Sequence, residues 1–256
     1  MLRRTLALLT LLALPTQVSA GEEVIAGLSQ NRVAITATFV GSEILIFGAV
    51  KRESPPPGTG DLNVVVVVEG PSHPVTVRRK EKRYGIWINT DAVKVDQAPS
   101  FYAIATSAPF EQAISETEDL RHHISIPRSV RLVGEAGTAP DIESFSQAVI
   151  RIRSASGLYK LEEGAVEVQQ DTLFNTSVTL PSNLTEGEYT ARIFLTRQGA
   201  IVSEFETQIE VQKVGLERWI FNLAHERPLV YGILSLVIAI AAGWTASAAF
   251  RVLLRS

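Results

Sequence analysis

Few residues in this chain could carry out covalent chemistry. Its 256 residues include no cysteine and only four histidines, two of which are adjacent at His122 and His123. Without cysteine the chain has no disulfide, no thiolate nucleophile and no ligand for an iron–sulfur cluster. Neighbouring side chains on a helix diverge by about 100°, so the two histidines are not expected to share a metal ion. We interpret them as exposed residues favoured by the C-terminus of a helix.

The sequence signatures of common enzyme classes do not occur. The patterns GxSxG, HExxH, GxxxxGK[ST] and GxGxxG are missing, which argues against serine hydrolysis, zinc proteolysis and nucleotide binding. The glycine-rich segment 57–61 lacks the lysine that a phosphate-binding loop requires, so we interpret it as an ordinary loop. We therefore expect no catalytic residue, no cofactor and no metal, and a protein that is not an enzyme.

A basic cluster stands out between residues 78 and 83. Five of these six residues are basic, although the rest of the exported region is acidic. The cluster suits contact with anionic lipid headgroups, an envelope polymer or an acidic protein. The alternative is a solvated hairpin tip whose charges prevent edge-to-edge pairing. The residues predicted to form this partner contact are Arg78, Arg79, Lys80, Lys82, Arg83 and the nearby Trp87.

Small residues recur every four positions in an uncharged C-terminal stretch. They are Ser235, Ala239, Gly243 and Ser247, which predicts one stripe of small side chains on a helix. Such a stripe lets a second helix approach closely within a membrane, so it is a candidate helix-packing face for another membrane protein or a second copy. Because these residue types are common in spans, a chance arrangement is the alternative.

The stretch that carries this stripe has the length of a membrane span. Leu229 to Phe250 is 22 residues without charge, which makes a helix of about 33 Å, enough to cross the bilayer. We assign residues 228–250 to a transmembrane helix. Arg251 and Arg255 follow the span and place the tail 251–256 in the cytoplasm.

The N-terminus is typical of an export signal. Residues 1–20 combine Arg3 and Arg4, a short apolar run and the small residues before Gly21, so we predict a signal peptide that is cleaved after Ala20. An uncleaved N-terminal anchor is the alternative. Setting aside the four arginines of the two termini leaves 20 basic residues against 27 acidic ones. This balance argues against binding of nucleic acid.

Between the termini, two-residue periodicity predicts a mainly β protein. We expect immunoglobulin-like antiparallel β-sandwich units at 21–107 and 158–213, with both faces of the strands 43–50 and 62–69 covered. Short inserted helices occupy the connecting segment 108–157, one from Ser107 to His123 and one from Pro140 to Gly157. Tyr189 follows Gly187 as in the tyrosine corner of such sandwiches. Whether the two β units share one core is left open.

The segment 214–227 has helical periodicity of its own. Leu216, Trp219, Ile220 and Leu223 fall on one face, which predicts an amphipathic helix lying at the membrane interface. A helix packed on the β domain is the alternative.

Several strings of the sequence resemble a known family. The chain is similar to the putative transmembrane protein family of alphaproteobacteria in the segments 25–29, 41–49, 78–80, 85–91, 214–218 and 225–228. The resemblance implies a single-pass protein of the bacterial inner membrane with a periplasmic N-terminal domain. The family has no assigned activity, so the resemblance implies no catalytic residues.

These features favour a membrane-anchored periplasmic accessory protein that acts by binding. Its expected partners are the lipid bilayer and another inner-membrane protein or envelope component, or a second copy bound through the span. The alternative is an envelope enzyme with an unrecognised active site between the two β units.

Overall fold

The computed structural model describes residues 22–36, 38–52, 60–131 and 142–253. The predicted signal peptide at residues 1–20, the segment 53–59 and residues 132–141 lie outside the described residues, and so does the end of the predicted cytoplasmic tail.

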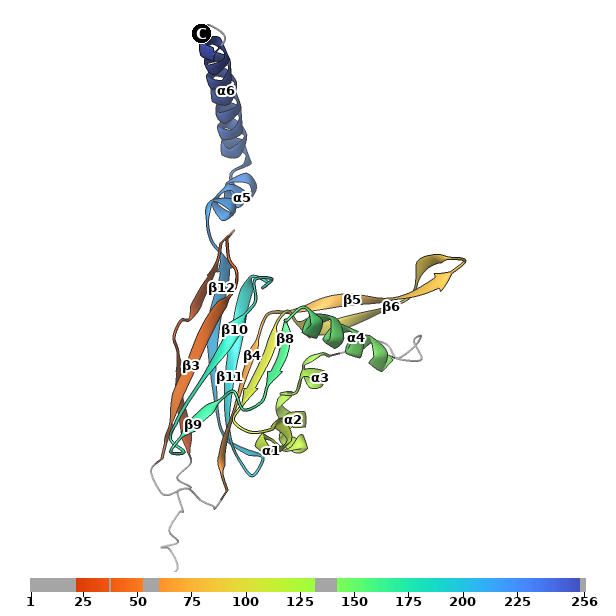
Figure 1. The fold of residues 1–256 in the computed structure, drawn as a ribbon, viewed down its shortest axis with the longest axis vertical. Helices are drawn as coiled ribbons and strands as arrows, with labels where there is room; N and C mark the ends of the chain where they lie inside the picture. Colours follow the sequence, from red (N-terminus) through yellow and green to blue (C-terminus); the bar gives the residue numbers. More distant parts are fainter. Residues whose placement is uncertain (1–21, 37, 53–59, 132–141, 254–256) are drawn as a thin grey trace, which may run out of the picture.

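Two facing sheets form the body of the molecule (Figure 1). The four-stranded sheet has the order β1 (Glu23–Leu28), β3 (Ser42–Lys51), β10 (Leu173–Leu180) and β9 (Glu167–Gln169). The six-stranded sheet has the order β2 (Arg32–Ile35), β12 (Ala200–Lys213), β11 (Gly187–Arg197), β4 (Leu62–Glu69), β7 (Tyr102–Thr106) and β8 (Tyr159–Glu162). Most neighbouring strands are antiparallel, as expected, whereas β2 runs parallel to β12 and β8 parallel to β7. The mainly β fold class is confirmed.

The structure answers the question of a shared core. Each sheet contains strands from both predicted β units, because β10 pairs with β3 and β11 pairs with β4. One hydrophobic cluster between the sheets draws on both segments, from Val24 to Val211. The two segments therefore form a single packed sandwich.

Strand β4 lies at the centre of this packing. Its five consecutive valines, 64–68, are at most 1% exposed, which confirms that both faces are covered. Val64, Val66 and Val68 enter the core between the sheets, and Val65 and Val67 enter a second cluster on the outer face of the six-stranded sheet. The same prediction for β3 is wrong. Leu45 and Phe47 are 44% and 46% exposed, because they lie on the uncovered outer face of the four-stranded sheet.

Short helices cover the second cluster. They are α1 (Phe110–Ala113), α2 (Glu116–His122), α3 (Ile126–Ser129) and α4 (Ile142–Ala155). The single helix expected from Ser107 to His123 is wrong: Pro109 precedes α1 and the extended residue Ile114 ends it. Ser115 then caps α2, and its N–H donates to Gly199 O at 2.8 Å, so the chain is held against the β11–β12 turn where a continuous helix would have carried it away.

The tyrosine corner forms at the start of β11. The buried Tyr189 hydroxyl donates to Thr185 O at 2.8 Å. At the other end of the strand, Gln198 and Gly199 make the two-residue turn into β12.

Two elements project from the sandwich (Figure 1). The hairpin of β5 (Ser72–Arg83) and β6 (Ile86–Pro99) forms a separate two-stranded sheet that extends past α4. At the C-terminal end, α5 (Leu216–Glu226) and α6 (Pro228–Leu253) continue from β12. Helix α5 contacts α6, and Trp219 on α5 is 55% exposed, so this helix does not bury its tryptophan against the sandwich.

Candidate functional site

The base of the β5–β6 hairpin is fixed to the body of the protein. Val75 and Val77 pack against the second hydrophobic cluster. The next residue on the same face, Arg79, donates from Nη2 to Ser144 Oγ at 2.7 Å, and its guanidinium lies 4.8 Å from the centre of the Phe145 ring on α4. The hairpin therefore leaves the sandwich in a fixed direction.

Beyond Arg79 the hairpin is free of the body. The register shifts between Arg79 and Lys80, and every residue from Lys80 to Asn89 is exposed. Tyr84 and Gly85 form the two-residue turn with φ of 50° and 87°, the left-handed backbone that suits the twist of a tight hairpin and that glycine adopts without steric cost.

Large apolar side chains crowd this tip. Tyr84, Ile86, Trp87 and Ile88 are 105%, 64%, 68% and 36% exposed. Single exposed apolar residues are common on protein surfaces but clusters of them are not, so this group makes the end of the hairpin a candidate contact surface. The contact residues predicted from the sequence include Trp87 but not Ile86 or Ile88, which the turn at residues 84–85 brings close to it.

The structure divides the predicted basic cluster. Arg78, Lys80, Lys82 and Arg83 are exposed, with Arg83 Nη2 3.3 Å from Glu81 Oε2. Arg79 is turned toward α4 and has a structural role. The remaining four basic residues and the four apolar ones lie on the same projecting element, and we call them together the hairpin tip.

The small-residue stripe of the C-terminal helix is present on α6. Ser235, Ala239, Gly243 and Ser247 are all exposed. The hydroxyl of Ser235 donates to Gly232 O at 2.9 Å, so its polar group is satisfied inside its own helix, as a lipid environment requires.

Among the described residues, one helix is long and apolar enough to span a membrane, over Pro228–Arg251. No part of its most apolar stretch is buried in the protein. Its exposed side chains include Leu229, Ile233, Leu236, Ile240 and Trp244. This agrees with the predicted span at 228–250.

The two adjacent histidines have different surroundings. His123 is exposed in a left-handed conformation at the C-terminus of α2, but His122 is half-buried, which corrects the expectation that both are exposed. The His122 ring packs edge-on against Phe194, with Nε2 3.5 Å from Glu118 and Nδ1 3.6 Å from Glu204. Within the described part of the chain, no group of three His, Asp or Glu residues is placed to hold a metal ion.

A buried ion pair that the sequence pattern did not reveal joins Glu22, just before β1, to Arg197 at the end of β11. Arg197 donates to both carboxylate oxygens of Glu22, at 2.7 Å and 2.9 Å, and to Gly60 O. Arg52 Nε lies 2.6 Å from the same carboxylate. The hydrogen bonds from Arg197, with those from Arg52, hold the pKa of Glu22 below its ordinary value despite burial. This pair has a structural role.

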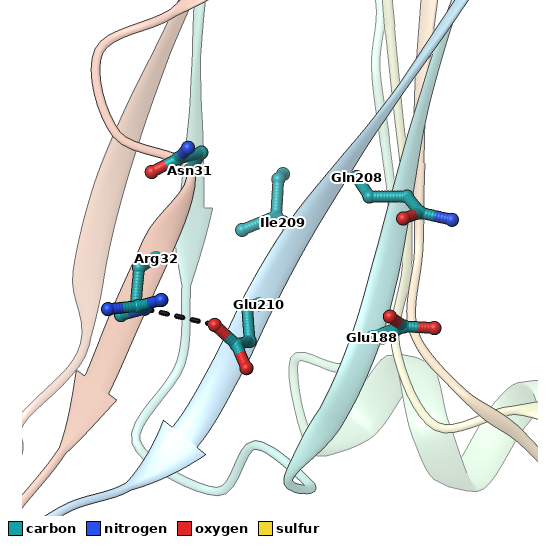
Figure 2. A pocket seen from close by; sticks show the side chains of 6 residues that line it. All are labelled: Asn31, Arg32, Glu188, Gln208, Ile209 and Glu210. Atoms are coloured by element: carbon teal, nitrogen blue, oxygen red, sulfur yellow. Dashed lines mark hydrogen bonds and ion pairs between the residues drawn. The ribbon is translucent and has the colours of Figure 1, made fainter.

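Three hollows on the surface of the body are lined by residues outside the hairpin tip. One of about 340 Å³ is lined by Asn31, Arg32, Glu188, Gln208, Ile209 and Glu210. Figure 2 shows the Glu210 carboxylate pointing toward Arg32, 2.9 Å from its Nε, while the Glu188 side chain lies apart from this pair. These six residues do not bring a nucleophile and a base together.

A second hollow, of about 490 Å³, lies on the outer face of the four-stranded sheet and is mostly apolar. Ile25, Phe47 and Leu173 line it and are 46–54% exposed. Nothing in the structure indicates what covers it.

The arrangement defines a class: a β-sandwich protein with a projecting hairpin and one candidate membrane span near its C-terminus. A family model described as "Putative transmembrane protein (Alph_Pro_TM)" matches residues 23–252. The chain belongs to this family, which confirms the resemblance seen in its sequence.

Other comparisons add little. No curated protein matches the chain. A crystal structure of Spo0M, a sporulation control protein from Bacillus subtilis, is 11% identical over 80% of this chain and 55% of that one, with a TM-score of 0.29. The chain thus spans about half the length of that protein, and the score is too low to support a shared fold.

Proposed function

We propose that this protein is a membrane-anchored binding protein of the bacterial envelope. The sandwich lies in the periplasm, α6 crosses the inner membrane, and the tail 251–256 is cytoplasmic. The protein acts as an accessory to another inner-membrane protein or envelope component.

The exposed side chains of the hairpin tip support a binding role most strongly. Four exposed apolar side chains and four exposed basic ones occupy an element that is fixed at its base and free at its end. Apolar surface exposed to water costs roughly 25 cal/mol of free energy per Å². A partner that covers the tip removes this cost. The basic residues favour a partner with negative charge.

Helix α6 supplies a second contact surface. Its small-residue stripe supports close packing with a helix of another membrane protein, or with a second copy of this chain.

The two β segments contribute strands to the same sheets. This arrangement supports a binding protein over an enzyme with an active site between the segments. The space between the two β segments is filled by side chains that are less than 10% exposed, such as Val66, Ile193 and Ile46. This close packing favours a binding protein over an enzyme with a cleft between the two segments.

Photo-crosslinking in cells tests the proposal. A photoreactive amino acid at Tyr84 or at Gly243 is expected to capture an envelope component or a membrane protein, whereas the same residue at Glu163, exposed on the sandwich, is a control expected to capture much less. Failure of both test positions to exceed the control would contradict the proposal.

A further inference from the structure

We infer that the hairpin tip binds the surface of a bilayer that contains anionic phospholipid, and so gives the protein a second membrane contact besides α6. This inference rests on the proposed membrane tether and names the ligand of the hairpin tip.

The distribution of apolar residues favours lipid over a protein surface. Paired residues of an antiparallel ladder share a face, so Trp87 lies beside Lys82 on one face, while Ile86 lies beside Arg83 on the other. Tyr84 occupies the turn between them. A flat protein surface covers one face of a hairpin and leaves the other in water, whereas a lipid interface surrounds an inserted tip on all sides.

The basic residues lie at the depth that this insertion requires. A strand rises about 3.3 Å per residue, so the side chains from Tyr84 back to Lys80 cover roughly 13 Å. The headgroup layer on each side of a bilayer is about 5 to 8 Å thick. When Tyr84 enters the boundary of the acyl chains, Lys82 and Arg83 lie within the headgroup layer. Lys80 lies just above this layer, and its long side chain can extend back to the phosphate groups. Tryptophan and tyrosine favour this same boundary, and long basic side chains extend from it toward the headgroups.

The charge of the sandwich gives the contact a direction. The outer faces of β11 and β12 carry exposed acidic residues at Glu188, Glu204 and Glu206, which an anionic surface repels. The hairpin is the basic part of an otherwise acidic head, so an anionic bilayer attracts it and turns the acidic face away.

The link to the membrane helix permits this orientation. The hairpin leaves the side of the head and leans toward the end that carries α5 and α6 (Figure 1). Gly215, between β12 and α5, is exposed with φ of 129°, and apart from its two chain neighbours no residue comes within 4 Å of the place where a Cβ would be. Bending here brings the tip to the same bilayer that holds α6, where tethering keeps its local concentration high.

A fluorescent label at the tip tests the inference in the full chain. Because the sequence has no cysteine, Ile86→Cys and Thr76→Cys each provide a unique site on the hairpin for an environment-sensitive dye. The full chain is placed in nanodiscs of phosphatidylcholine, with or without phosphatidylglycerol. With phosphatidylglycerol, we expect the label at 86 to shift to shorter wavelength and to be quenched several-fold more by shallow spin-labelled lipid than the label at 76. Equal quenching at the two positions would overturn the inference.

Charge variants separate lipid binding from nonspecific dye insertion. Replacing Lys80, Lys82 and Arg83 by Gln is expected to weaken insertion about a hundredfold, since each basic residue near an anionic surface strengthens binding by about fivefold. The matched control, Arg121→Gln on α2, replaces an exposed basic residue of the head and should have no effect. Unchanged insertion of the triple variant would contradict the inference.

A second measurement avoids the label. Trp219→Phe and Trp244→Phe leave Trp87 as the sole tryptophan, and its emission should be quenched by brominated phosphatidylglycerol. A tip that stays in water while Gly243 captures a protein in cells would overturn this inference and leave the proposed function standing. A tip that enters lipid while neither crosslinking position captures a protein would contradict the proposed accessory role and leave this inference standing.

Discussion

The guanidinium of Arg79 lies 4.8 Å from the centre of the Phe145 ring, and this contact joins the β5–β6 hairpin to helix α4. One basic residue of the predicted cluster, Arg79, thus has a packing role, whereas Arg78, Lys80, Lys82 and Arg83 are exposed. The contact fixes the direction in which the hairpin tip is presented.

Arg79→Ala is expected to lower the free energy of unfolding by about 1 to 2 kcal/mol, because it removes a cation–π contact and a charged hydrogen bond to Ser144. Chemical unfolding of the full chain in detergent measures this change, and hydrogen exchange should increase in β5 and β6. Arg78→Ala, at an exposed neighbour, should change stability by less than about 0.5 kcal/mol. Equal effects of the two variants would show that the contact does not anchor the hairpin.

Glu22→Gln is expected to destabilise the sandwich by about 3 to 5 kcal/mol, because it leaves the buried Arg197 guanidinium without its counter-charge. Glu23→Gln is the control, since Glu23 forms an exposed pair with Lys51. Urea unfolding at pH 7 compares them, and a loss no larger than that of the control would contradict the structural role of the pair.

The same pair predicts a loss of stability in acid. Hydrogen bonds from Arg197 hold the pKa of Glu22 below the ordinary 4.5 in the folded protein, so protons bind the unfolded chain more readily. The stabilisation is complete above pH 4.5 and is lost as the pH falls through the folded pKa. Between pH 5 and pH 3 the wild type should lose more unfolding free energy than Glu22→Gln, and parallel curves would exclude this linkage.

Tyr189→Phe is expected to cost about 1 kcal/mol, because the Thr185 carbonyl loses its buried hydroxyl donor while the ring remains packed. Tyr84→Phe removes a hydroxyl from the exposed hairpin tip and should leave the melting temperature unchanged. Thermal unfolding of both variants tests whether the corner stabilises the fold.

Gly48→Ala is expected to destabilise the protein by about 1 to 3 kcal/mol, since a Cβ at this position would clash with the Phe174 ring and lie 2.7 Å from Ile25 O. Gly232→Ala, which has no neighbour within 4 Å, is the control. A Gly48→Ala protein as stable as the control would mean that β1, β3 and β10 are packed less closely than the structure has them.

Local patterns were sufficient to predict the elements whose burial follows from their own sequence. Val64 to Val68 predicted a strand that is covered on both faces, and the uncharged run from Leu229 predicted α6. Leu45 and Phe47 were misassigned because an apolar strand residue does not reveal whether another layer covers it. The break at Ile114 was missed because it depends on a hydrogen bond from Ser115 to the distant Gly199.

The candidate site was only partly predictable for the same reason. A run of basic residues is visible in the sequence, but the role of Arg79 depends on Phe145, which lies 66 positions further along the chain. The apolar half of the hairpin tip becomes apparent only when the turn at Tyr84 and Gly85 places Ile86 and Ile88 beyond the covered base.

The most direct test of the membrane arrangement is cysteine labelling in spheroplasts. Glu206→Cys on the sandwich and Ser256→Cys at the chain end are each treated with a membrane-impermeant maleimide. We expect the cysteine at 206 to react in intact spheroplasts and the one at 256 to react only after lysis. The opposite pattern, or reaction of both before lysis, would contradict a head held outside the cytoplasm by one C-terminal membrane helix.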